Sequence, residues 1–225
     1  LGASKKIGSA DKDFRYMAVS DLLSELSKAS GLEASVERKV ATAVMERLDD
    51  ASGDVSALAV KCLGPLVRTG SDTTATSIAK GLCEGLVSGK EQRSDACAIA
   101  LKTVLTELPA GKPGAAPKAM LAPLCTAVAD SGLGANALIE CLDVLQALLE
   151  RFGAGMEREL ESTRGALMPL LDASRAPVRK RAAGCIAVLA AHLPPAALAE
   201  IVGDALRDLA PGSAAAAAGT RVLLV

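Results

Sequence analysis

The sequence of 225 residues has almost no aromatic side chains: Phe14, Tyr16 and Phe152 are the only ones, and there is no Trp. A core without rings has to be built from Ala, Leu and Val, which suits close-packed helices better than sheets. Histidine is equally scarce, because His192 is the single copy. The sequence therefore offers little basis for histidine catalysis or a histidine metal site.

The chain also lacks an excess of charge of either sign. Its 25 basic and 26 acidic residues leave a formal net charge of −1, unlike the basic balance of a general nucleic-acid binder. No apolar stretch reaches the roughly 18 residues that a membrane span needs, and no basic segment precedes a signal-peptide core. We expect no nucleic acid and no membrane among the partners, and a location in the cytoplasm, the nucleus or both.

Cysteine pairs at motif spacing are missing as well. The six cysteines lie far apart, at positions 62, 83, 97, 125, 141 and 185, without a C-x-x-C pair. We expect them to be reduced, small apolar core residues of an intracellular protein. The sequence starts at Leu1 and ends in an apolar run to Val225 without a helix stop signal, which indicates a fragment of a longer chain.

An apolar ladder recurs along the chain. From Val55 the apolar residues fall at i, i+3, i+4 and i+7, the pattern of one helix face. An early copy places Phe14, Met17, Leu22 and Leu26 in the core. With Ala59 as the anchor, successive spacings are 41, 38, 41 and 44 residues, the period of HEAT-type helix pairs. The anchors in chain order are Ala18, Ala59, Cys97, Leu138 and Ala182.

Partner helices of suitable length lie between the ladder helices, at residues 36–48, 73–87, 116–129 and 158–171, and residues 196–209 would open a sixth pair. We therefore predict an all-α fold, a HEAT-repeat α-solenoid in which antiparallel helix pairs stack into a superhelix. Residues 1–225 would form one solenoid segment of about five pairs and a partial sixth. The Pro- and Gly-rich stretch 109–117 is interpreted as an inter-repeat loop, with a domain linker as the alternative.

No residue cluster makes a convincing catalytic site. Asp49 and Asp50 lie in a predicted turn, where capping is the simpler role. Cys185 is within two helical turns of His192, but Cys62, Cys141 and Cys185 recur at equivalent ladder positions, as core packing predicts. A glycine-rich phosphate loop is missing from the sequence. We expect a protein that is not an enzyme and that has no catalytic residues, cofactor or metal.

The same register predicts a row of side chains opposite the core. A wheel at about 100° per residue puts Lys61, Gly64 and Arg68 on the side away from Ala59. HEAT second helices usually line the concave face, so we predict a partner-binding surface there, of mixed charge that favours a protein over a polyanion. The predicted residues are Tyr16, Ser20, Lys61, Arg68, Asp95, Lys102, Asn136, Glu140, Asp143 and Lys180.

The densest basic run is 175–181. Arg179 is interpreted as part of a ladder of loop charges between repeats. For Lys180 and Arg181, contact with an acidic partner or a phosphate is the functional alternative to a structural role.

Several segments go beyond a generic repeat. They are residues 11–18, 37–40, 58–67 (LAVKCLGPLV), 90–92, 101–109 and 178–181. In sequence, order and spacing they closely resemble the amino-terminal repeats of the cullin-associated, neddylation-dissociated (CAND) family. The resemblance covers roughly residues 9–193 and is strongest up to Pro109.

The resemblance implies a scaffold that binds a cullin and its RING-box protein when the cullin lacks its ubiquitin-like modifier. It also implies competition with adaptor and substrate-receptor modules, so that receptors are exchanged on the ubiquitin ligase. Another HEAT scaffold, such as a nuclear transport receptor or the scaffold subunit of a phosphatase, is the alternative, because fold alone does not settle function.

Overall fold

The computed structural model describes residues 6–111 and 114–209, and its elements there are all helices. They are α2 (Lys12–Lys28), α3 (Ala34–Arg47), α4 (Gly53–Thr69), α5 (Asp72–Leu86), α6 (Glu91–Glu107), α7 (Ala116–Ala129), α8 (Ala135–Phe152), η1 (Gly153–Gly155), α9 (Leu160–Leu167), η2 (Met168–Asp172), α10 (Ala176–Ala190) and α11 (Pro195–Leu209). The predicted ladder helices are α2, α4, α6, α8 and α10, and the predicted partner helices are α3, α5, α7 and α9 with η2.

Helix starts follow from local capping chemistry. The side chain of Asp11 accepts a hydrogen bond from the backbone N–H of Asp13 at the start of α2, and Ser71 caps α5 in the same way through Thr74. A similar hydrogen bond connects two repeats. The Oδ1 of Asp72, in the first turn of α5, accepts from the backbone N–H of Ala115, 2.8 Å away, just before α7. Helix α7 begins at Ala116, the start predicted for this partner helix.

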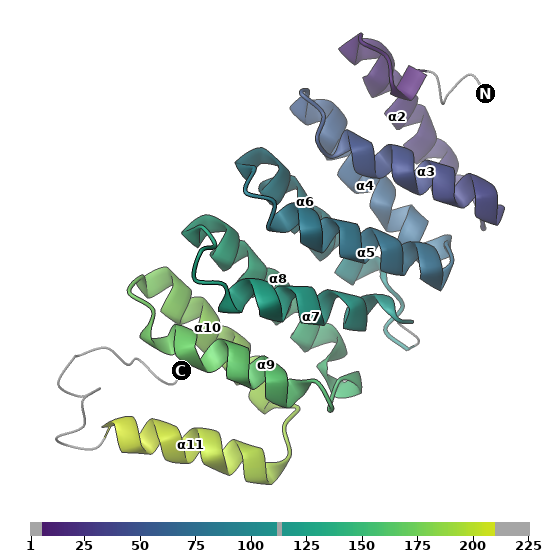
Figure 1. Ribbon diagram of the computed structural model, residues 1–225. Coiled ribbons are helices and arrows are strands. Elements are labelled where there is room, and N and C mark those ends of the chain that lie inside the picture. Colours follow the sequence, from purple (N-terminus) through teal and green to yellow (C-terminus); the bar gives the residue numbers. More distant parts are fainter. Residues whose placement is uncertain (1–5, 112–113, 210–225) are drawn as a thin grey trace. The chain divides into compact units, whose positions relative to one another are not determined.

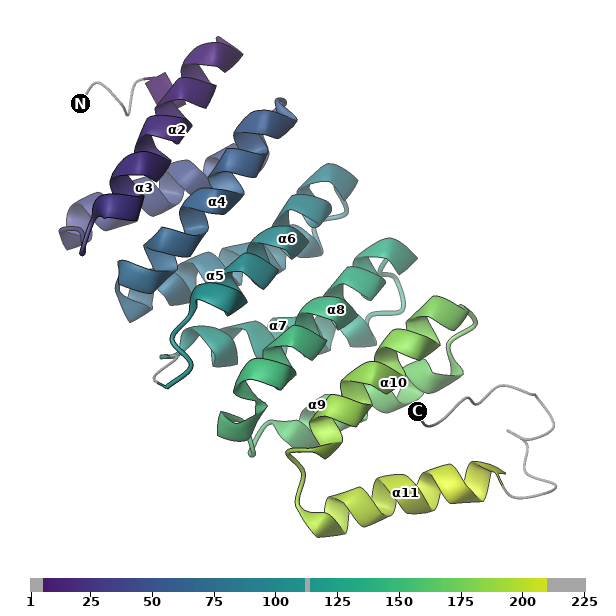
Figure 2. The same ribbon diagram turned by 180° about the vertical axis from the view of Figure 1, so that it is seen from behind.

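The chain divides into two compact units, Leu1–Pro123 and Leu124–Val225. In the first unit, α2, α4 and α6 pack side by side in one layer, and α3 and α5 form a second layer against them (Figures 1 and 2). Fully buried aliphatic side chains fill the space between the layers, among them Leu63, Leu66, Ile78, Leu82 and Leu101. The core is therefore aliphatic, as the shortage of aromatic residues predicts.

The second unit repeats this arrangement. Helix α10 packs along α8, and α9 with η2 lies against α10. Its buried residues are again aliphatic, with Leu142, Leu145 and Leu189 inaccessible to solvent. Both units confirm the all-α, HEAT-type fold, while the single continuous segment over residues 1–225 stays a prediction.

The predicted register of the fourth ladder helix is wrong by one turn. In α2, α4, α6 and α10 the anchor residue comes six positions after the first helical residue. Helix α8 begins at Ala135, so its anchor is Cys141, which is fully buried, and not Leu138, which is half-buried. The apolar spacing continues one turn upstream in this longer helix, which is why the pattern alone misplaced it. Cys141 therefore corresponds to Cys97 rather than to Cys62.

The first ladder helix differs from the prediction on one face. Phe14 and Met17 were expected in the core, but they are 49% and 56% exposed. Val55, at the position of Phe14 in α4, is fully buried on the side that packs against α2, where Cys62 Sγ lies 3.8 Å from the carbonyl oxygen of Val19. In the described part of the chain, α4 is the helix with extensive packing along α2.

The fourth residue of ladder helices α4, α6 and α10 ties the helix to the backbone just before it. Ser56 and Ser94 donate their hydroxyls to the carbonyl oxygens of Leu48 and Leu86, at 2.9 and 2.5 Å. Arg179 occupies the same position in α10, and its Nη1 donates to two carbonyl oxygens of its own loop, those of residues 173 and 174. The prediction that Arg179 joins a charge ladder between repeats is therefore replaced by a role within its repeat.

Candidate protein-interaction surface

The outward sides of α2, α4 and α6 form the surface that we call the ladder-helix face of the first unit (Figure 2). The structure places six of the predicted partner-binding residues on these three helices. Tyr16, Lys61, Arg68 and Asp95 are exposed, whereas Ser20 and Lys102 are half-buried. Exposure does not show that a partner binds here, so the assignment of these residues to binding stays a prediction.

Two details change the interpretation of the middle of this face. Gly64, expected to point outward, is buried: a Cβ there would lie 3.2 Å from Cγ of Glu107. Glu107 Oε2 also accepts from Nη1 of Arg68 at 2.9 Å. Glu107 of α6 therefore packs over α4 at Gly64 and forms an ion pair with Arg68. One nitrogen of the Arg68 guanidinium is thus already bonded within the protein.

Sequence reasoning missed Ile99, which is 57% exposed on α6. Ile99 lies two residues after its anchor, as Ser20 and Lys61 do in α2 and α4. The three residues therefore form one row across neighbouring helices. The register contained the signal, but the sequence prediction did not include this position of the helix in the row.

In the second unit the four predicted residues fall into two groups. Asn136 and Lys180 are exposed, and Glu140 and Asp143 are half-buried. Asp143 Oδ1 lies 2.9 Å from Nη1 of Arg181, which joins α8 to α10. After the register correction, Asp143 is the counterpart of Lys61, while Asn136 and Glu140 leave the predicted row.

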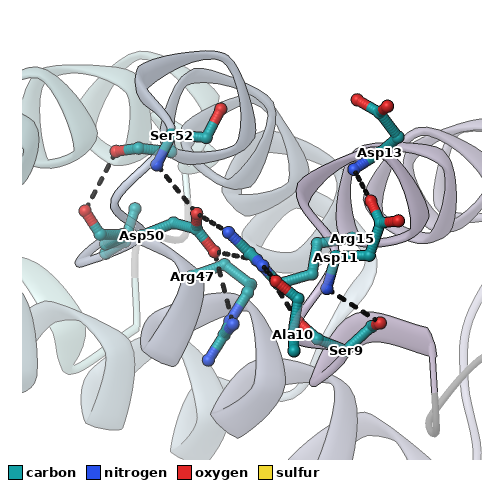
Figure 3. Close-up of polar contacts among 10 residues, drawn as sticks. Ser9, Ala10, Asp11, Asp13, Arg15, Arg47, Asp50 and Ser52 are labelled. Carbon is teal, nitrogen blue, oxygen red and sulfur yellow. Dashed lines mark hydrogen bonds and ion pairs between the residues drawn. The ribbon is translucent and has the colours of Figure 1, made fainter.

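A charge network joins neighbouring repeats of the first unit. The guanidinium of Arg15 donates to both carboxylate oxygens of Asp50, which follows α3 (Figure 3). The hydrogen bond from Arg15 is the main reason why the pKa of Asp50 lies below its usual value, although burial opposes the shift. The neighbouring Asp49 accepts from Arg93 of α6 at 2.6 Å. The predicted turn position of the two aspartates is confirmed, but neither of them caps a helix: Asp50 accepts from the backbone N–H of Ser52 within the turn, and both form ion pairs between repeats.

The thiols have the character of core residues. All six are free, five of them are buried, and Cys125 is half-buried. Burial raises the pKa of Cys62, Cys141 and Cys185 to about 12 each, which keeps them in the unreactive thiol form. The expectation of apolar core cysteines is confirmed for the five buried ones, and the expectation that all six are reduced stays a prediction.

Cys185 and His192 do not combine into a nucleophile and base. Cys185 Sγ lies 3.2 Å from the carbonyl oxygen of Leu142, and the His192 ring packs on Gly153 so closely that a Cβ there would be 2.5 Å from its Cδ2. Over the described residues, no group of three or more His, Cys, Asp or Glu side chains is arranged to hold a metal ion. In the same part of the chain, none of the helices combines the length and apolarity needed to cross a membrane.

The stacked helix pairs define a helical-repeat solenoid of the HEAT and armadillo type. The microtubule plus-end tracking structure of XMAP215, CLIP-170 and EB1 aligns with a TM-score of 0.66 over 90% of this chain and 83% of the other, at 16% identity. The MAST/Orbit N-terminal domain aligns with a TM-score of 0.63 over 92% and 86%, also at 16% identity. Both likenesses concern the fold alone.

Curated relatives give the family. The chain is 41% identical over 181 residues to cullin-associated NEDD8-dissociated protein 1 of Drosophila melanogaster, covering 79% of this chain and 14% of that protein. It is 39% identical to protein 2 of Mus musculus (95% and 18%) and 35% identical to protein 1 of Arabidopsis thaliana (88% and 16%). No family model matches. The chain belongs to the cullin-associated NEDD8-dissociated family and spans less than a fifth of the length of these relatives.

Proposed function

We propose that this chain is a non-enzymatic scaffold segment that binds the cullin and RING-box core of a ubiquitin ligase. The identity of 35–41% to proteins named for cullin association carries the proposal. In finer detail, the segment binds the core in its unneddylated form and competes with adaptor and substrate-receptor modules. It thereby contributes to receptor exchange in the cytoplasm or nucleus.

The ladder-helix face of the first unit supports a role in binding a folded protein. It is a layer of three helices whose outward residues combine one aromatic, one aliphatic and several charged side chains: Tyr16, Ile99, Lys61 and Asp95. Large apolar side chains surrounded by polar ones are typical of protein-binding surfaces. The energy of such an interface is distributed over several repeats, so that binding depends on simultaneous engagement.

Competition explains exchange without covalent chemistry. If the scaffold and the receptor module each weaken the binding of the other, linkage requires that the effect be reciprocal. A bulky modifier on the cullin surface that this segment contacts would weaken binding through steric overlap. The mechanism therefore needs a shaped surface and no reactive side chain.

The test is binding of this chain to a purified cullin–RING complex, unmodified and neddylated, each with and without its receptor module. We expect binding to the unmodified, receptor-free complex and loss of binding when either the modifier or the receptor is present. Equal binding to all four forms would contradict the regulatory part of the proposal. Absence of binding to any of them would contradict cullin binding by this segment.

A further inference from the structure

The three helices of the ladder-helix face run parallel and in register. Cys62 Sγ of α4 lies 3.8 Å from the carbonyl oxygen of Val19 in α2, and Arg68 of α4 pairs with Glu107 of α6. Each contact joins nearly the same turn of its two helices, counted from their first residues. Equivalent positions of α2, α4 and α6 can therefore be compared across the face (Figure 2).

Outward charges on this face are sorted along the helices. On a wheel of about 100° per residue, the outward bases Lys61, Lys102 and Arg68 lie from the middle of α4 and α6 onward. The helix dipole favours acids in a first turn, which accounts for those of α2 and α4 but not for the fifth residue of α6. The outward acids all lie near the helix starts, and they are Asp13, Asp54 and Asp95.

Lys61 and the three outward aspartates have unused charges. All four are exposed, and none of them forms an ion pair in the part of the chain that the structure describes. Ile99, 57% exposed, occupies the position of Lys61 in the neighbouring helix. Because packed helices lie about 8–10 Å apart, one small patch of a partner can contact both side chains.

The distance between the acidic and basic parts is set by α4. Asp54, Lys61 and Arg68 are seven residues apart, so about 10 Å of helix separates each from the next. Arg68 already pairs with Glu107, which leaves Lys61 as the outward cation of this helix without an ion pair within the described residues. The face therefore has an acidic end and, about 10 Å away, a centre that is basic and apolar.

This pattern defines the chemistry of a partner surface, because opposite charges attract across an interface and like charges repel. On the basis of the proposed function, we infer that the cullin–RING complex contacts Ile99 and Lys61 with an apolar side chain flanked by a carboxylate. A basic group about 10 Å from that carboxylate contacts the acidic end at Asp54. The reverse orientation places like charges together, so the sorted charges fix the direction in which the partner lies on α4.

The experiment measures binding of the intact chain to a purified cullin–RING complex without modifier or receptor module. We expect Lys61→Glu and Asp54→Lys each to weaken binding at least tenfold. Asp95→Lys is a second reversal at the acidic end, and it keeps the test decisive if Asp54→Lys lowers the thermal midpoint. Glu84→Lys is the matched control, because Glu84 is an exposed acid of α5 in the other layer, and it should bind normally.

A photoreactive residue in place of Ile99 identifies the partner's carboxylate by cross-linking. Reversal of that carboxylate to Lys should weaken binding of the unaltered chain and restore binding of Lys61→Glu. If the unaltered chain binds but the reversals behave like the control, or the reversed partner does not restore Lys61→Glu, the inference is wrong while cullin binding stands.

Absence of binding by the unaltered chain overturns the inference together with the proposed function. Sedimentation showing that the chain self-associates and that Ile99→Ser makes it monomeric overturns the inference alone, because a second copy then occupies the face.

Discussion

Arg15 and Asp50 form a two-point ion pair between neighbouring repeats: Nε to Oδ2 is 2.7 Å and Nη2 to Oδ1 is 2.8 Å. The Asp50 side chain is only 2% exposed, and its oxygens also accept from Arg47 and from the backbone N–H of Ser52. The third nitrogen of Arg15 reaches two loop carbonyl oxygens before α2, those of residues 9 and 10 (Figure 3). One guanidinium thus connects the start of α2 to the turn between α3 and α4.

Asp50→Ala is expected to destabilise the protein by about 3 kcal/mol, since it removes the buried carboxylate that pairs with the half-buried guanidinium groups of Arg15 and Arg47. The free energy of unfolding in urea measures the loss. Asp49→Ala is the neighbouring control: the Asp49–Arg93 pair is 36% and 28% exposed, so its removal should cost at most about 1 kcal/mol. If both variants lose the same free energy of unfolding, the buried Asp50 pair contributes no more to stability than the exposed Asp49 pair.

The same network predicts a dependence of stability on pH. Hydrogen bonding to Arg15 lowers the pKa of Asp50, and for Glu37 the hydrogen bonds from Thr74 and Ser71 outweigh burial and lower its pKa as well. Groups with a depressed pKa in the folded state stabilise the protein above their ordinary values of about 4, and this contribution is lost as pH falls through the folded-state values.

Thermal midpoints should therefore change little between pH 7 and 5 on account of these two groups, and should fall below about pH 4. Asp50→Asn and Glu37→Gln should each start from a lower midpoint at pH 7 and lose less of it on acidification. A variant with the unaltered acid dependence would show that its carboxylate does not contribute.

The repeat pattern was predictable from the sequence because apolar spacing reports directly on which helix face is buried. The pattern could not distinguish Leu138 from Cys141 as an anchor, since a shift of one turn preserves the spacing. It could not anticipate that Phe14 is exposed, because that depends on whether another helix packs on α2. The pairing of Arg15 with Asp50, 35 residues apart, required the packing of two repeats to be known.

The buried thiols should be unreactive in the folded protein. With a pKa of about 12, Cys62, Cys141 and Cys185 are about one part in ten thousand thiolate at pH 8, and they are fully buried. Titration with Ellman's reagent should detect the half-buried Cys125 first and all six thiols in urea. Fast reaction of the three buried thiols without denaturant would indicate local opening of the repeats.

Two buried serines should contribute through their loop hydrogen bonds. Ser56→Ala and Ser94→Ala each leave a carbonyl oxygen, that of Leu48 or Leu86, without its hydroxyl donor. We expect each variant to lose about 1 kcal/mol in urea unfolding. Ser24→Ala, at an exposed position of α2, should be neutral or slightly stabilising because alanine is the better helix former.

The ladder-helix face yields the sharpest test of the proposed cullin binding. Lys61→Glu and Ile99→Ser change neighbouring positions of one row, and both side chains are exposed, so neither should lower the thermal midpoint appreciably. If the face binds the cullin–RING complex, each should weaken binding by about tenfold or more, because a reversed charge and a lost apolar contact both act at the interface. Lys39→Glu carries the same charge reversal on α3, outside this face, and should bind normally. If all three variants bind alike, the cullin contacts another surface, and Ile99 is exposed for a reason unrelated to binding.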